Sequence, residues 1–139
     1  MAGKYMTNCI FCKIIAGELP GYKVYEDEYT MAFLDINPVN FGHTLVVPKK
    51  HLVNIEDVDE ETLCQVIKTV KKVGLALKQK LGVPGYNLQV NNDPAAGLIV
   101  PHLHFHVVPR FPDDGLKLWL QKQYKEGEAD EVLNKIKIS

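Results

Sequence analysis

The feature that most constrains this chain is the stretch 100–110, where three histidines alternate with apolar residues. Strict alternation is typical of a strand with one buried face. Side chains at i, i+2 and i+4 share a face, so His102, His104 and His106 should form one row, about 6.6 Å apart along the backbone. The chain has only five histidines, and three on one face are difficult to explain by packing. This strand is therefore the first candidate for a functional site.

Length and composition indicate a single soluble domain. The chain has 139 residues, enough for one hydrophobic core, and we expect one domain over 1–139 with its core at about 9–111 and a helical C-terminal tail. A net charge of −1 gives no reason to expect long nucleic acid or an anionic membrane as a partner. No apolar run approaches the ~20 residues of a membrane span, and the first residues do not resemble a signal peptide. We therefore expect a cytoplasmic protein whose three cysteines stay reduced.

Periodicity predicts an α+β fold built on an antiparallel five-stranded meander sheet. Alternating or apolar segments bounded by turn residues indicate the strands, and the turn Asp27-Glu28 should join the first two as a hairpin. A short apolar helix or turn at 10–15 precedes them, and a short second helix is expected near Ala129 to Ile136. The strands are expected at 22–26, 29–35, 43–47, 87–91 and 98–109.

One long helix, expected over 57–81, should cross over between the third and fourth strands. Asp57 and Glu60 resemble a capping box at its start, and Gly82 should stop it. Apolar residues at three- and four-residue spacing give one stripe that should pack in the core. Cys64 lies near that stripe and is expected to be buried. The stripe consists of Leu63, Val66, Ile67, Val70, Val73, Leu77 and Leu81.

A second group of residues has the chemistry of a metal site. Cys9 and Cys12 form a Cys-x-x-Cys pair that can chelate zinc, and His51 and His102 would complete a tetrahedron. The two histidines lie too far apart in sequence for a finger motif. The cysteine pair alone also fits a redox motif or two small buried residues. A thioredoxin-like site fits poorly because no βαβ pattern flanks the pair.

Residues 102–108, HLHFHVV, resemble the histidine triad nucleotide-binding family, whose motif is His-φ-His-φ-His-φ-φ with φ apolar. Three upstream segments, 9–15, 32–36 and 42–51, resemble it as well and occur in the same order. The resemblance runs from about residue 9 to 111. It implies an antiparallel sheet with few helices and a homodimer that forms one ten-stranded sheet.

The resemblance also implies a ligand and a set of site residues. The ligand is a purine nucleotide, as a conjugate of AMP or GMP, with Asp35 on the ribose hydroxyls. Phe11, Phe33 and Ile36 would line the base pocket, while His43 and Asn91 would lie close to the phosphate. Prokaryotic members similar to this chain carry a structural zinc at the positions of Cys9, Cys12, His51 and His102 and need no organic cofactor.

The chain departs from the family pattern just before the triad. Family members commonly have Gly-Gln-Ser or Gly-Gln-Thr there, whereas this chain has Gly97, Leu98 and Ile99. Ile99 would then face the substrate without the hydroxyl that meets the leaving group. We expect slower turnover or a different leaving-group preference.

The main hypothesis is covalent catalysis at the α-phosphorus of a phosphoramidate or dinucleoside polyphosphate. A neutral imidazole is a good nucleophile at pH 7, and His104 resembles the family nucleophile. His106 would hydrogen-bond the non-bridging oxygens, and His43 would orient the nucleophile. His102 would be a zinc ligand that fixes the strand.

Two alternatives belong to other functional classes. In a metallohydrolase, the three triad histidines would hold a catalytic zinc, although the outer two lie about 13 Å apart at their roots on a straight strand. In a non-catalytic nucleotide sensor or adaptor, Leu98 and Ile99 would have disabled leaving-group departure.

Overall fold

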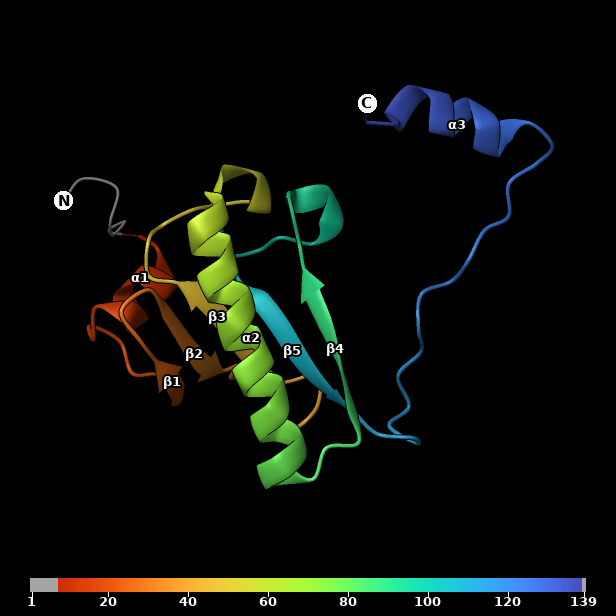
Figure 1. The fold of residues 1–139 in the computed structure, drawn as a ribbon. Helices are drawn as coiled ribbons and strands as arrows, with labels where there is room; N and C mark the ends of the chain where they lie inside the picture. Colours follow the sequence, from red (N-terminus) through yellow and green to blue (C-terminus); the bar gives the residue numbers. More distant parts are fainter. Residues whose placement is uncertain (1–7, 139) are drawn as a thin grey trace.

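A computed structural model describes residues 8–138, which contain five strands and three α-helices (Figure 1). The parts of the expected domain at residues 1–7 and 139 lie outside the described residues. Two short 3₁₀ helices, η1 (Ile55–Asp57) and η2 (Pro94–Ala96), lie in the loops. The other elements are α1 (Ile10–Ile15), β1 (Lys23–Glu26), β2 (Thr30–Leu34), β3 (Thr44–Pro48), α2 (Glu60–Leu81), β4 (Gly85–Val90), β5 (Phe105–Arg110) and α3 (Glu128–Ile136).

The five strands form one antiparallel sheet in the order β1-β2-β3-β5-β4. The predicted α+β class, the five-stranded antiparallel sheet and the long crossover helix are confirmed. The strand order differs from a simple meander because α2 carries the chain past the next position, so that β4 forms the edge and β5 returns between β3 and β4 (Figure 1). The hairpin turn is also confirmed: Asp27 Oδ1 accepts the N–H groups of Tyr29 and Thr30, both at 2.8 Å.

The histidine strand begins later than the sequence predicts. The expected strand covered 98–109, but β5 starts only at Phe105. Pro101 has no N–H to donate to a ladder, and the Pro48 carbonyl accepts the ring Nε2–H of His102 at 2.9 Å. The Pro48 carbonyl, at the end of β3, is thus paired with the His102 side chain and not with a backbone N–H of a neighbouring strand. The predicted alternation still holds, because Leu103 and Phe105 are buried against α2.

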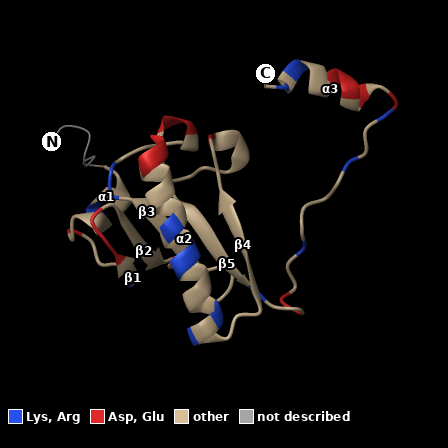
Figure 2. Ribbon diagram, viewed as in Figure 1, with Lys and Arg blue, Asp and Glu red and all other residues tan. Residues whose placement is uncertain are grey.

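Helix α2 covers one face of the sheet and differs from the prediction at its start. Its N-cap is Asp59, whose carboxylate accepts the Thr62 N–H at 3.1 Å. Asp57 is instead the last residue of η1, and its carboxylate accepts the N–H of Asn54, the N-cap of that turn. The predicted cap at Asp57 was therefore wrong, because the chain makes a separate 3₁₀ turn first. Gly82 ends the helix in the left-handed conformation, φ 70°, as predicted. Figure 2 shows acidic residues at the start of α2 and lysines further along, which complements the helix dipole.

The buried face of α2 is narrower than the predicted stripe. Val66, Val70, Val73 and Leu77 are buried, but Ile67 and Leu81 are exposed at 45% and 56%. Cys64 is exposed as well, so its predicted burial was wrong. At about 100° per residue, it lies roughly 200° around the helix from Val66 and therefore faces solvent.

A second hydrophobic cluster lies under α1, around Phe11, Phe33 and Leu45. The core cluster that contains the buried residues of α2 is separate from it. The row of histidines lies on the α1 side, and this layer positions the site.

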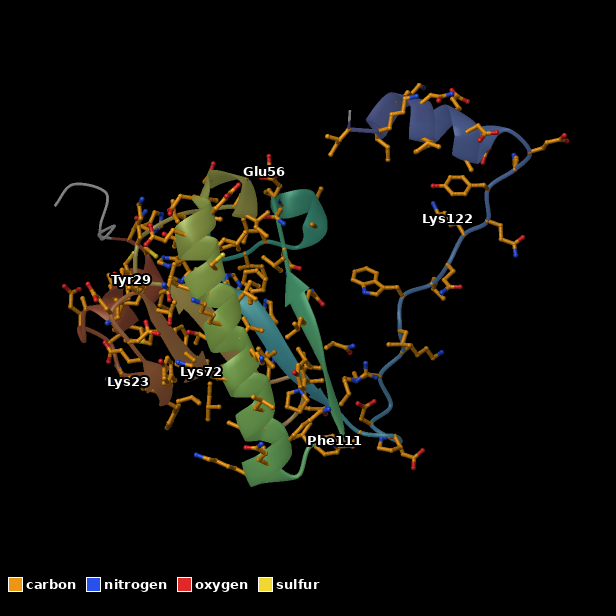
Figure 3. All side chains as sticks on the ribbon, in the orientation of Figure 1. Lys23, Tyr29, Glu56, Lys72, Phe111 and Lys122 are labelled. Atoms are coloured by element: carbon orange, nitrogen blue, oxygen red, sulfur yellow. The ribbon has the colours of Figure 1, made fainter. Side chains whose placement is uncertain are left out.

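The chain beyond β5 leaves the sheet (Figure 1). Residues 111–127 contain no helix or strand, and α3 confirms the predicted short second helix. Figure 3 shows Phe111 near the end of β5 and Lys122 far from the sheet. Trp119 and Leu120 are 85% and 95% exposed. No helix in residues 8–138 combines the length and the apolar character needed to cross a bilayer.

Candidate active site and metal centre

Two clusters of side chains meet at the α1 side of β5. One combines Cys9 and Cys12 at the start of α1 with His51 and His102. The other combines Asp35 and His43, near β2 and β3, with His106 of β5. His104 lies between them, with its ring centroid 4.9 Å from that of His106 and 5.0 Å from that of Phe11.

The first cluster has the dimensions of a tetrahedral metal site. The Nδ1 of His102 lies 3.5 Å from the sulfurs of Cys9 and Cys12 and 3.2 Å from Nδ1 of His51. The Cys12 sulfur lies 3.3 Å from Nδ1 of His51. Zinc bonds of about 2.0–2.3 Å give ligand separations of roughly 3.3–3.8 Å in a tetrahedron. The distances and the donor set fit such a metal.

The sequence explains why these four donors converge. Cys9 is the N-cap of α1, and its sulfur accepts the N–H of Cys12 at 3.3 Å, which turns both sulfurs to one side. His102 donates its Nε2–H to the Pro48 carbonyl, so the lone pair of Nδ1 faces the sulfurs. Such an outer hydrogen bond fixes the tautomer of a ligating histidine.

A chain of hydrogen bonds fixes the tautomers of the second cluster. The Val39 N–H donates to Nδ1 of His43 at 3.1 Å, so the ring proton of His43 lies on Nε2. That Nε2 is 2.9 Å from Nδ1 of His106 and donates to it. The proton of neutral His106 must then lie on its Nε2. His106 therefore presents an N–H donor on its far side.

The His104 ring is oriented by the backbone. Its Nδ1 lies 2.6 Å from the His102 carbonyl, which can only accept, so the proton lies on Nδ1. The lone pair of His104 is on Nε2. We expected His43 to orient this ring; the structure instead shows His43 bonded to His106, and the tautomer of His104 depends on the His102 carbonyl.

Burial keeps the site histidines neutral near pH 7. It lowers the pKa of His106 to about 4, with further lowering from His104 and His43. Burial also lowers the pKa of His43, against the opposing effect of Asp35, whose Oδ2 lies 3.7 Å from Nε2 of His43. The pKa of His104 is lowered for the same reason. Neutral rings suit a nucleophile and a hydrogen-bond donor.

A cleft of about 530 Å³ opens beside these rings, within the usual size range of small-molecule sites. His104 and His106 form part of its wall. All six residues predicted to bind substrate also line it. These are Asp35, Phe11, Phe33, Ile36, Asn91 and Ile99.

The six lining residues differ in how they are held. Phe11 and Phe33 are buried with ring centroids 5.4 Å apart, so each is both core and cleft wall. Ile36 and Ile99 are 76% and 90% exposed and form the rim. Asp35 accepts the N–H of Asn37 at 2.9 Å in the turn after β2.

Part of the cleft wall was not predicted from the sequence. Ile10 and Ile14 of α1, with Leu19 in the turn that follows, line its apolar part. The apolar run at 10–15 indicated a helix but not which neighbour it would cover. The carbonyls of Pro48 and His102 were also missed, because backbone groups carry no residue-specific signal.

Comparison with known proteins gives one family. Residues 16–113 match the family model described as HIT domain. An uncharacterised HIT-like protein of Methanocaldococcus jannaschii is 53% identical over 129 residues, which cover 93% of this chain and 98% of that protein. An adenosine 5′-monophosphoramidase of Schizosaccharomyces pombe is 40% identical over 103 residues, 74% of each chain. An adenylylsulfatase of Arabidopsis thaliana is 38% identical over 110 residues, 79% of this chain and 56% of that protein.

Solved structures similar to this chain belong to the same family. A HIT family protein of Bacillus subtilis superposes with a TM-score of 0.82 at 38% identity, covering 95% of this chain and 99% of that one. A zinc-bound histidine triad family protein of Mycobacterium smegmatis gives 0.75 at 36% identity, covering 92% and 91%.

Proposed function

This chain belongs to the HIT domain family, and on that premise we propose that it cleaves nucleotide conjugates at the α-phosphorus and releases a nucleoside monophosphate. The observation that carries the proposal is the His104 ring, whose Nδ1–H is bonded to the His102 carbonyl at 2.6 Å while the ring lines the cleft. The ring is thereby prepared for attack through Nε2. The relatives named for phosphoramidase and adenylylsulfatase activity support the reaction class.

The reaction has two displacements at phosphorus. His104 Nε2 forms a bond to phosphorus while the bond to the leaving group breaks and its electron pair goes to the leaving atom. The resulting N-nucleotidyl imidazolium keeps its Nδ1–H on the His102 carbonyl, which stabilises the positive charge. Water then forms a P–O bond, the P–N bond breaks with its pair returning to Nε2, and one water proton passes to solvent. The Nε2–H of His106 donates to the non-bridging oxygens in both steps.

The nucleotide lies along the cleft in this proposal. Phe11, Phe33 and Ile36 enclose a purine base, because they supply the apolar wall of the cleft. Asp35 accepts from the ribose hydroxyls, and Asn91 lies near the phosphate. The base slot is apolar and accepts adenine or guanine.

We assign zinc to Cys9, Cys12, His51 and His102, where it would have a structural role. The fit of the four donors to a tetrahedron and the zinc-bound relative support this assignment. The metal would tie α1 to His102, three residues before the start of β5, and so hold the segment that carries His104. A reducing, cytoplasmic setting would keep both thiols available as ligands.

We also propose a homodimer joined along β4. In the described sheet β4 is an edge strand, and its Leu88 is 51% exposed. The segment that follows β5 runs on the β4 side of the sheet (Figure 1). Its Leu118, Trp119 and Leu120 are 71%, 85% and 95% exposed. Sedimentation at micromolar concentration tests the dimer, and a monomer would contradict it.

The metallohydrolase alternative fits the geometry poorly. His102 turns its Nδ1 to the cysteine cluster, while Nδ1 of His106 faces His43. The three triad rings do not converge on one point. The sensor alternative makes the opposite prediction for turnover and is decided by the experiment below.

The experiment measures metal content and turnover in two variants, His104→Ala and His51→Ala. We expect His104→Ala to keep its metal and lose hydrolysis of an adenylyl conjugate, whereas His51→Ala loses metal. Loss of metal in His104→Ala would support the metallohydrolase. Tight AMP binding by the wild type without turnover above background would support the sensor.

A further inference from the structure

We propose that the leaving group departs as an anion, without a proton from the protein. The site would then favour conjugates in which AMP is joined to an oxyacid, such as a phosphate or sulfate, over conjugates in which it is joined to an amine. This inference rests on the proposed function, because it takes attack by His104 as given.

The sheet order places the leaving group at one end of the cleft. Strand β5, which carries His106, lies between β3 and β4. The apolar wall comes from α1 and β2 on one side, and Asn91, Gly97 and Ile99 follow from β4 and η2 on the other. A nucleotide with its base against the apolar wall and its phosphorus at His104 directs its leaving group to the β4 end.

At the β4 end, none of the side chains in the described part of this chain readily gives up a proton. Among the described residues that line the cleft, none is Ser, Thr, Tyr, Cys, Lys or Arg. Asn91 is polar, but its amide oxygen accepts from Gln89 at 2.9 Å and an amide N–H is not an acid. Ile99, at the rim and 90% exposed, places an apolar side chain there.

Neither histidine of the cleft can supply a proton to the leaving group. His104 is the nucleophile, and its one proton is held by the His102 carbonyl. His106 receives the Nε2–H of His43 on its Nδ1, so protonation of that nitrogen would set two N–H groups against each other. Neutral His106 donates a hydrogen bond, but releasing that proton would leave an imidazolate anion. His106 is therefore a donor to phosphate oxygens and not a general acid.

Without a proton donor, the rate of cleavage should depend on the chemistry of the leaving group. When the P–O bond of an anhydride breaks, its electron pair goes to an oxyacid oxygen that is stable as an anion. When a P–N bond breaks, the nitrogen must gain a proton, and no side chain that lines the cleft in this chain supplies one. A positioned general acid is worth about 10²–10⁴-fold. The structure therefore predicts a loss of that order for amines.

The experiment compares kcat/KM for adenylyl sulfate, adenosine 5′-(p-nitrophenyl) phosphate and adenosine 5′-phosphoramidate in wild type, Ile99→Ser and Ile99→Ala. We expect the wild type to cleave the two oxyacid or phenol conjugates at least ~100-fold faster than the phosphoramidate. Ile99→Ser should raise phosphoramidate cleavage about tenfold or more relative to adenylyl sulfate. Ile99→Ala, which removes the same bulk without adding a hydroxyl, should not change that ratio; intrinsic reactivity cancels in such comparisons between variants.

Comparable wild-type rates on all three conjugates would overturn the inference and leave the proposed function standing. An equal gain for phosphoramidate in Ile99→Ala and Ile99→Ser would also overturn it, because bulk and not a missing proton would then be the cause. Failure to cleave even adenylyl sulfate would refute the proposed function itself, and the inference with it.

Discussion

Replacing His43 with phenylalanine removes the N–H that fixes the His106 ring. The ring of His43 is 3% exposed, and its Nε2 donates to Nδ1 of His106 at 2.9 Å. Without it, Nδ1 of His106 loses its partner, at a cost of about 1–3 kcal/mol, and the proton can move from Nε2 to Nδ1. The donor to the phosphate is then lost. Losing one such donor costs ~2.7–4 kcal/mol, or about 10²–10³-fold in kcat.

Single-turnover kinetics with an adenylyl conjugate test this expectation. His43→Phe should lower the rate of nucleotidyl transfer by about 10²–10³-fold with little change in substrate affinity. His43→Gln is the matched control, because its amide N–H can still donate to His106, and it should recover at least tenfold of the loss. ¹⁵N NMR of the His106 ring should show the Nε2–H tautomer in wild type and a mixture in His43→Phe. Equal losses in both variants with an unchanged tautomer would refute the positioning role.

Three further predictions concern the core, the metal and pH. Leu103→Ala should destabilise the protein by about 2–5 kcal/mol in urea unfolding, because Leu103 is 1% exposed between β5 and α2; a loss below ~1 kcal/mol would contradict this packing. Cys12→Ser should abolish stoichiometric zinc in the purified protein and lower the melting temperature, whereas Cys64→Ser, at an exposed position, should change neither; full zinc content in Cys12→Ser would contradict the assignment. His106 has a pKa of about 4 in the folded state against about 6.5 unfolded, so its neutral form favours folding fully above pH 6.5, and the contribution is lost as the pH falls from 6.5 to 4. The difference in unfolding free energy between wild type and His106→Gln should therefore change across that window and stay constant above it.

Local pattern was sufficient to predict the elements and the row of histidines, whereas the residues expected to bind substrate came from the family resemblance. Strict alternation located the histidine face, because the two-residue period of extended chain survives even where the hydrogen-bonded ladder does not. Gly82 marked the end of α2 because it adopts φ 70° there. The cap at Asp57 failed because two acidic residues two positions apart, Asp57 and Asp59, are both plausible caps, and the separate turn of η1 decides between them.

Long-range placement was harder to predict. The order of β5 and β4 depends on how far α2 carries the chain, which no residue of β4 or β5 encodes. The expectation that His43 would orient His104 failed for a similar reason. The tautomers of these histidines depend on backbone groups. The Val39 N–H fixes the ring proton of His43, which is donated to His106, and the His102 carbonyl fixes the ring proton of His104.

In the proposed mechanism, His104 forms a transient bond to phosphorus. Rapid mixing with adenosine 5′-(p-nitrophenyl) phosphate, quenching in base and peptide mass spectrometry test it most directly. We expect an adenylyl adduct on the peptide that contains His104, formed in a burst with one equivalent of p-nitrophenol per site. Steady turnover with no burst and no adduct, or an adduct that persists in His104→Ala, would contradict it.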